Sequence, residues 1–283
     1  MTLTVRAHAK LNLTLEVLGK RADGFHELRS LMSTLALHDI VHLDPAPTIE
    51  VCCTLPELDG RANLAFRAAE LLRAAAGHAG GARITIDKAI PVAAGLGGGS
   101  ADAAAVLVGL NRLWESGLDT DALRDLAAQL GSDVPFCVVG GTALAAGRGE
   151  ILRPIPPLPE ATVLLVRPPF AVSTARVYGA LTADGYGTGE ATRRLAVDAA
   201  RTSPTDWRPT NDLEPVTCRL YPVVHEVLEF LRSHGAAHAA MCGSGPSCFA
   251  HFAPAERAEH IAMAARAHGW EAWVTRITAG DEK

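Results

Sequence analysis

The 283-residue sequence lacks a large net charge, a long apolar run and a CxxC cysteine pair. Its 31 acidic and 26 basic residues give a formal net charge of only -5, which does not indicate a nucleic-acid-binding surface. Its longest apolar stretches, such as residues 103–110, fall far short of the roughly 20 residues that cross a bilayer. We therefore expect a globular protein that binds neither nucleic acid nor membranes.

The first ten residues also lack the apolar core of a signal peptide, because Arg6, His8 and Lys10 interrupt them. Six cysteines occur without CxxC spacing in a chain large enough to fold without disulfides. Reduced thiols and a cytoplasmic location are the expectation. Cys137 lies in the apolar segment 134–139, which predicts a buried, unreactive thiol.

The first half of the chain carries clear periodic patterns. Alternating apolar residues over 3–17 predict a strand, and the turn residues at 19–24 with a second apolar run to Leu43 predict an antiparallel start. Further elements expected here are a helix over 62–76, a strand over 83–88, a helix carrying Val106, Leu110 and Leu113, and a helix over 121–130 that ends at Gly131.

The segment 154–159 (PIPPLP) is rich in proline, which is typical of a semi-rigid connector. We therefore predict one domain over residues 1–153 and another over 154–283. A strand over 162–166 and a helix over 223–231 make the second half mixed as well. Three glycines in the segment 182–192 predict a mobile loop.

A glycine-rich segment, PVAAGLGGGSADA, occupies residues 91–103 between the predicted strand and helix. Four glycines within five positions remove side chains where backbone N–H groups would approach an anion closely. The helix that follows would point its N-terminal N–H groups at the same place, which favours phosphate. A flexible turn without a ligand is the alternative. Cations near in sequence that could add positive potential are Lys10, Lys20, Arg21 and Lys88.

Two known phosphate motifs fit this segment incompletely. A Walker-type loop is excluded because no lysine follows the glycines. Gly95, Gly97 and Ser100 give an imperfect dinucleotide fingerprint, and Glu115 follows at 20 residues, but near a helix end rather than on a second strand. A dehydrogenase remains an open alternative at this point.

The segment 91–103 resembles the central phosphate motif of the superfamily of galactokinase, homoserine kinase, mevalonate kinase and phosphomevalonate kinase. Four further segments resemble motifs of one family within it, the 4-diphosphocytidyl-2-C-methyl-D-erythritol kinases: 9–13 (AKLNL), 24–28 (GFHEL), 131–136 (GSDVPF) and 243–247 (GSGPS). The resemblance implies an α+β, two-domain small-molecule kinase fold with mixed sheets and packed helices, and an active site in the cleft between the domains.

The resemblance also implies ATP-dependent phosphorylation of the 2-hydroxyl of 4-diphosphocytidyl-2-C-methyl-D-erythritol, in the synthesis of isoprenoid precursors. It makes Asp133 the catalytic base and Lys10 its electrostatic partner, which would stabilise the charge that develops during transfer. Without it, Asp133 would be interpreted as a helix cap and Lys10 as a solvated lysine on a strand. A homoserine or mevalonate kinase and a non-catalytic nucleotide-binding protein are the alternatives.

On the substrate side, the resemblance places Phe25, His26 and Tyr178 around the cytosine and Asn12 at a polar contact. Relatives often carry tyrosine where this chain has Phe25, so ring stacking is kept and a hydrogen bond from that position is in doubt. Gly243, Ser244 and Gly245 form a second glycine loop, which would contact the substrate diphosphate or brace the first loop. A tight turn before an apolar strand over 248–250 is the alternative.

On the nucleotide side, the resemblance implies contacts from the loop and from two residues outside it. The predicted nucleotide-binding residues are Asn63, Lys88, Pro91, Val92, Ala93, Ala94, Gly95, Leu96, Gly97, Gly98, Gly99, Ser100 and Ala101. Mg²⁺ is expected with ATP, and Ser100 is the one suggested protein contact. The histidine pairs 38/42 and 234/238 are rejected as metal sites, because one lies in a strand-like run and Gly235 interrupts the other. Both a monomer and a homodimer are compatible with the sequence.

Overall fold

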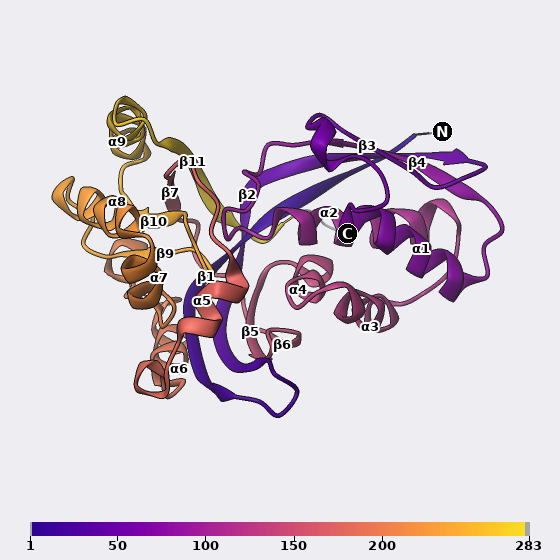
Figure 1. Ribbon diagram of the computed structural model, residues 1–283. Coiled ribbons are helices and arrows are strands. Elements are labelled where there is room, and N and C mark those ends of the chain that lie inside the picture. The colour runs from indigo at the N-terminus through magenta and orange to yellow at the C-terminus, as the bar shows by residue number, and fades with distance from the viewer. Residues whose placement is uncertain (1, 281–283) are drawn as a thin grey trace.

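The computed structural model describes residues 2–280 and shows helices packed against connected, mixed β-sheets (Figure 1). The strands are β1 (Leu3–Lys20), β2 (His26–Ala46), β3 (Glu50–Cys53), β4 (Gly81–Asp87), β5 (Thr142–Gly147), β6 (Ile151–Pro154), β7 (Thr162–Arg167), β8 (Thr210–Asn211), β9 (Ala239–Met241), β10 (Cys248–His251) and β11 (Glu271–Thr278). Hydrogen-bonded neighbours run in the order β3-β4-β2-β11-β7-β10-β9, while β1 pairs with β2 and β8, and β5 pairs with β2 and β6.

Helices cover these sheets in two groups, which Figure 1 shows on either side of the long strands. The α-helices are α1 (Leu64–Ala76), α2 (Gly98–Leu113), α3 (Thr120–Leu130), α4 (Val134–Val139), α5 (Thr174–Ala180), α6 (Glu190–Asp198), α7 (Glu214–Leu220), α8 (Pro222–Ser233) and α9 (Ala255–Ala267), and the short 3-10 turns are η1 (Pro56–Leu58), η2 (Ala183–Gly185) and η3 (Pro204–Asp206). Within residues 2–280, no helix combines the length and the apolar character that crossing a bilayer requires.

The long antiparallel pair of β1 and β2 carries much of the site. Its pairing confirms the predicted antiparallel start, and the alternating residues Leu11, Leu13 and Leu15 are buried as expected. The first part of β2 pairs with β5, whereas its last part pairs with β4. The β1–β2 register shifts at three places, one of them between His8 and Lys10, and such irregularities re-aim side chains.

Two large cores lie on opposite ends of this pair. Helices α1 to α4 cover the first core with β1, β2 and β4, and helices α5 and α7 to α9 cover the second with β7, β9 and β10. Strand β11 joins the two ends, because its residues 271–276 pair with β7 and its last two residues pair with Leu35 and Thr34 of β2. The segment between β6 and β7 contains the proline-rich connector, and the domain boundary between residues 153 and 154 remains a prediction.

Two local predictions are wrong. The loop predicted over 182–192 contains η2, and from Glu190 onwards it forms α6. A distant carboxylate explains the helix start, since Glu16 of β1 accepts hydrogen bonds from the backbone N–H groups of Gly189 and Thr192 at 2.9 and 2.7 Å.

Cys137 is only half-buried, because it packs at the edge of the first core rather than inside it. All six cysteines are free thiols.

His251 predicts a measurable acid sensitivity of the fold. Its ring is buried edge-on against Trp207, with 5.1 Å between the ring centroids, and burial lowers the pKa of His251 from 6.5 to about 4. The stability that depends on neutral His251 is therefore complete above pH 6.5 and is lost as the pH falls towards 4, by about 3 kcal/mol in total.

Urea denaturation from pH 7 to pH 4 checks this expectation. The free energy of unfolding should fall more steeply for the wild type than for His251→Leu, which has no proton to gain at this site. Identical pH dependence in the two proteins would contradict the assignment.

Candidate active site

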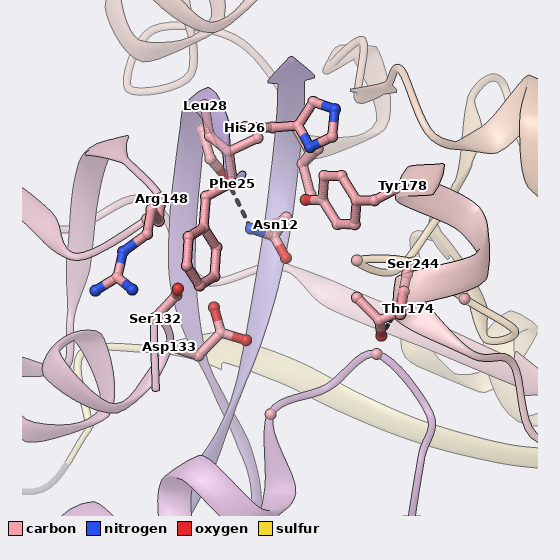
Figure 2. A pocket seen from close by; sticks show the side chains of 18 of the residues that line it. Asn12, Phe25, His26, Leu28, Ser132, Asp133, Arg148, Thr174, Tyr178 and Ser244 are labelled. Carbon is pink, nitrogen blue, oxygen red and sulfur yellow. Dashed lines mark hydrogen bonds between the residues drawn. The ribbon is translucent and has the colours of Figure 1, made fainter. Parts of the chain in front are cut away.

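A cavity of about 850 Å³ lies between the two groups of helices, and both halves of the chain line it (Figure 2). From the first half come β1, the turn before β2, the glycine loop and the segment before α4. From the second half come α5 and the loop that contains Gly243. The cleft predicted between the two halves of the chain is therefore present.

The glycine loop opens α2 as predicted. Helix α2 begins at Gly98, and its cap residue Gly97 has a φ of 70°, which favours glycine. The loop borders a second cavity of about 410 Å³, and Ala93, Gly95, Gly97 and Ser100 line both cavities. The two cavities therefore meet at the glycine loop.

Most of the predicted nucleotide-side residues line this second cavity. They are Asn63, Lys88, Pro91, Val92, Ala93, Ala94, Gly95, Gly97, Gly98, Gly99 and Ser100. Leu96 and Ala101 do not, because their side chains are buried in the first core. The amide of Asn63 caps α1 by accepting from the N–H of Ala65 at 2.9 Å, and it donates to the carbonyl of Leu58. Asn63 is therefore held by the backbone at the cavity wall.

Lys88 lies in a buried group of charges beside the loop. Its Nζ is 2.5 Å from a carboxylate oxygen of Asp39 and 2.7 Å from one of Asp102. Burial, together with the Asp39 carboxylate, raises the pKa of Asp102, while the two carboxylates raise the pKa of Lys88 against the opposite effect of burial. Asp39 also accepts from the N–H groups of Ala89 and Ile90, which fixes the chain where it leaves β4 for the loop.

Lys10 and Asp133 meet in the larger cavity. The Lys10 side chain is 5% exposed, and its Nζ is 3.1 Å from Oδ2 of Asp133 and 2.7 Å from Oδ1 of Asn12. Asn12 donates in turn to Ser30 at 2.8 Å. Asp133 precedes α4, yet its side chain caps no backbone N–H, so its carboxylate faces the cavity. The cap interpretation of Asp133 is therefore wrong.

Aromatic side chains form another part of the wall of the larger cavity. Phe25, His26 and Tyr178 all line the cavity, and the rings of His26 and Tyr178 are 5.1 Å apart. Burial lowers the pKa of His26, which favours the neutral ring, and burial raises the pKa of Tyr178. The three residues named together from the sequence are therefore brought together by the fold.

The second glycine loop lies directly against the first. A Cβ on Gly95 would come within 2.1 Å of the carbonyl oxygen of Cys242, and a Cβ on Gly243 within 3.0 Å of the carbonyl oxygen of Gly95. The amide of Asn211 donates to the carbonyls of Met241 and Gly243, and Ser244 hydrogen bonds with Thr174 at 2.8 Å. This loop both lines the cavity and braces the first loop.

The comparisons with known proteins agree on one family. The chain matches the family model described as GHMP kinases N terminal domain over residues 63–141, and the one described as GHMP kinases C terminal over 192–269. A curated relative from Pelotomaculum thermopropionicum, named 4-diphosphocytidyl-2-C-methyl-D-erythritol kinase, is 47% identical and the match covers 98% of each chain. One of the same name from Moorella thermoacetica is 45% identical, with 97% of this chain and 98% of the relative covered. The chain belongs to the 4-diphosphocytidyl-2-C-methyl-D-erythritol kinase family.

Solved structures confirm the predicted fold of this kinase. The crystal structure of a 4-(cytidine 5'-diphospho)-2C-methyl-D-erythritol kinase matches with a TM-score of 0.85 and 37% identity, covering 99% of this chain and 100% of that one. Homoserine kinase from Cytophaga hutchinsonii matches with a TM-score of 0.76 at 18% identity, covering 99% and 96% of the two chains, which shows a shared fold. The dehydrogenase alternative is thereby excluded.

Sequence patterns did not predict two further residues of the kinase's site. Tyr186 lines the cavity 6.2 Å from His26, measured between the ring centroids, and Arg148 lies 4.7 Å from the centroid of Phe25. Tyr186 is an aromatic residue in a glycine-rich segment, and Arg148 is a cation between two glycines, so both offered a weak local signal. No group of three or more metal-ligating side chains occurs among residues 2–280.

Proposed function

We propose that the chain transfers the γ-phosphoryl group of ATP to the 2-hydroxyl of 4-diphosphocytidyl-2-C-methyl-D-erythritol, in the synthesis of isoprenoid precursors. The observation that carries the proposal is the Lys10–Asp133 ion pair, at 3.1 Å, in a cavity bounded by the glycine loop and by aromatic side chains. Phosphoryl transfer requires a positioned acceptor, a base beside that acceptor and positive charge near the transferred group. In this proposal the cavity walls position the acceptor, Asp133 is the base and Lys10 supplies the positive charge.

In the proposed reaction, Asp133 accepts the proton of the substrate hydroxyl as that oxygen attacks the γ-phosphorus. The bond between this phosphorus and the bridging oxygen breaks, and ADP leaves with the electron pair. The Lys10 ammonium, held by Asn12, stabilises the charge on the phosphoryl oxygens. Because Lys10 is almost fully shielded from water, its charge acts more strongly than it would on the surface.

The glycine loop and the N-terminus of α2 are proposed to hold the phosphates of ATP. Their backbone N–H groups and the helix dipole both favour an anion there. The adenine side of the nucleotide would lie towards Asn63 and Lys88, which line the smaller cavity. Mg²⁺ would neutralise phosphate charge, and Ser100 suits this position because it lines both cavities.

The cytidyl group is proposed to lie at the aromatic wall. Phe25 and Tyr178 offer ring faces for the base, and neutral His26 can both donate and accept at its polar edge. Asn12 contacts the methylerythritol part, and the loop of Gly243, Ser244 and Gly245 meets the diphosphate. Neither homoserine nor mevalonate has a nucleobase that could stack on these aromatic side chains.

The test is an acceptor comparison with purified protein, ATP and Mg²⁺. We expect phosphorylation of the cytidyl substrate at its tertiary hydroxyl, detected by ³¹P NMR, and no transfer to homoserine or mevalonate. Transfer to homoserine or to mevalonate, without transfer to the cytidyl substrate, would overturn the proposed substrate. ATP binding without transfer to any acceptor would favour a non-catalytic nucleotide-binding protein.

A further inference from the structure

Phe25 is the last residue of the turn between β1 and β2, directly before His26, and it is 49% exposed. The turn's backbone is fixed locally, because the N–H of Arg21 donates to the carbonyl of Phe25 at 2.8 Å and the N–H of Phe25 donates to Asp23 at 3.1 Å. Neither hydrogen bond restrains the phenyl ring. The ring, which is not part of a described core cluster, needs another contact to hold its orientation.

Arg148 supplies that contact from a different turn, the one between β5 and β6. Its guanidinium carbon lies 4.7 Å from the centroid of the Phe25 ring, within the range of a cation–π interaction. Figure 2 shows Arg148 on one side of the ring, with Tyr178 across the cavity on the other side. One ring face is therefore covered by the guanidinium, and the other is available to a ligand.

The two turns are joined so that this contact is maintained. Glu27 forms an ion pair with Arg21 at 2.8 Å in the first turn and accepts from the N–H of Gly147 at 3.2 Å in the second. Glu150 accepts from the N–H of Arg148 at 2.6 Å, and its carboxylate lies 3.6 Å from the Arg148 side chain. Glu27 therefore fixes the backbone just before Arg148, and Glu150 fixes Arg148 itself.

We propose that Arg148 is a positioning residue for the cytosine ring, acting through Phe25 and without touching the substrate. This inference rests on the proposed cytidyl substrate. By covering the outer face of Phe25, the guanidinium holds the phenyl ring ready for stacking, so less conformational freedom is lost when the base binds. Arg148 thereby supports stacking on the exposed ring of Phe25.

Steady-state kinetics of Arg148→Met test the inference. We expect the KM for the cytidyl substrate to rise about two- to fivefold, the range given by a cation–π contact at an exposed site, with kcat and the KM for ATP unchanged. Arg153→Met is the matched control, because it removes the same charge from an exposed position on β6. Thermal denaturation of each variant shows whether its fold is intact.

A double-mutant cycle with Phe25→Ala separates the possible causes. If Arg148 acts through the ring, Arg148→Met adds nothing to the KM once Phe25 is removed. A full additional increase in the Phe25→Ala background would show direct contact with the substrate and overturn the inference. An unchanged KM in the single variant would do the same. Wild-type protein inactive on the cytidyl substrate would instead refute the proposed function.

Discussion

Replacing either member of the Lys10–Asp133 pair should lower kcat at least about a hundredfold, the lower scale for loss of a general base. In Asp133→Asn, the amide cannot take the hydroxyl proton, although it keeps the size of the carboxyl group. In Lys10→Met, the buried stem still packs, but the charge that faces the phosphoryl group is gone. Because both effects arise in the transition state, kcat and kcat/KM should fall together.

The measurement is single-turnover phosphoryl transfer from ATP, after thermal denaturation has shown that each variant is folded. Arg124→Ala is the control. It breaks a surface ion pair with Asp121, neither residue lines either cavity, and kcat should therefore stay unchanged. Turnover within a factor of a few of the wild type in a folded Asp133→Asn protein would remove Asp133 from the proposed mechanism.

Substitution of Gly95 by alanine should damage both stability and nucleotide binding. Gly95 has a φ of 78°, a conformation costly for alanine, and its added Cβ would lie 2.1 Å from the backbone oxygen of Cys242. Since neither loop can hold its position, we expect a loss on the order of 3 kcal/mol in the free energy of unfolding. The KM for ATP should rise at least about tenfold, because a disordered cradle presents no fixed N–H groups.

Gly99→Ala is the matched control for this prediction. A Cβ at Gly99 meets nothing within 4 Å, and the residue lies inside α2, where alanine is favoured over glycine. Its stability should equal or slightly exceed that of the wild type. Chemical denaturation of both variants decides the matter, and equal stability of Gly95→Ala and the wild type would show that the two loops are not packed as described.

Sequence patterns predicted the helices, strands and loops whose formation depends on residues close together in the chain. The alternation along β1, the helix ending at Gly131 and the glycine loop opening α2 all depend on residues close in sequence. Helix α6 was missed because its start depends on Glu16, far along the chain. Arg148 was missed for the same reason, since only pairing of β2 with β5 brings its turn to Phe25.

The site residues show the same division. Periodicity did not place Lys10 beside Asp133, and only the resemblance suggested it, because β1 and the start of α4 meet through packing of the whole first half. Lys88 was expected at the nucleotide cavity, but its partners Asp39 and Asp102 gave no signal. Buried ion pairs form between residues distant in sequence, and their spacing therefore follows no periodic rule.

The return of β11 to β2 has a consequence for synthesis on the ribosome. The strand that joins the two ends of the molecule follows the other strands in the chain, so it emerges from the exit tunnel after them. Each core can begin to form earlier, but the link that β11 makes between them cannot. A nascent chain that stops before β11 would hold the residues of both cavities without the strand that joins the two sheets.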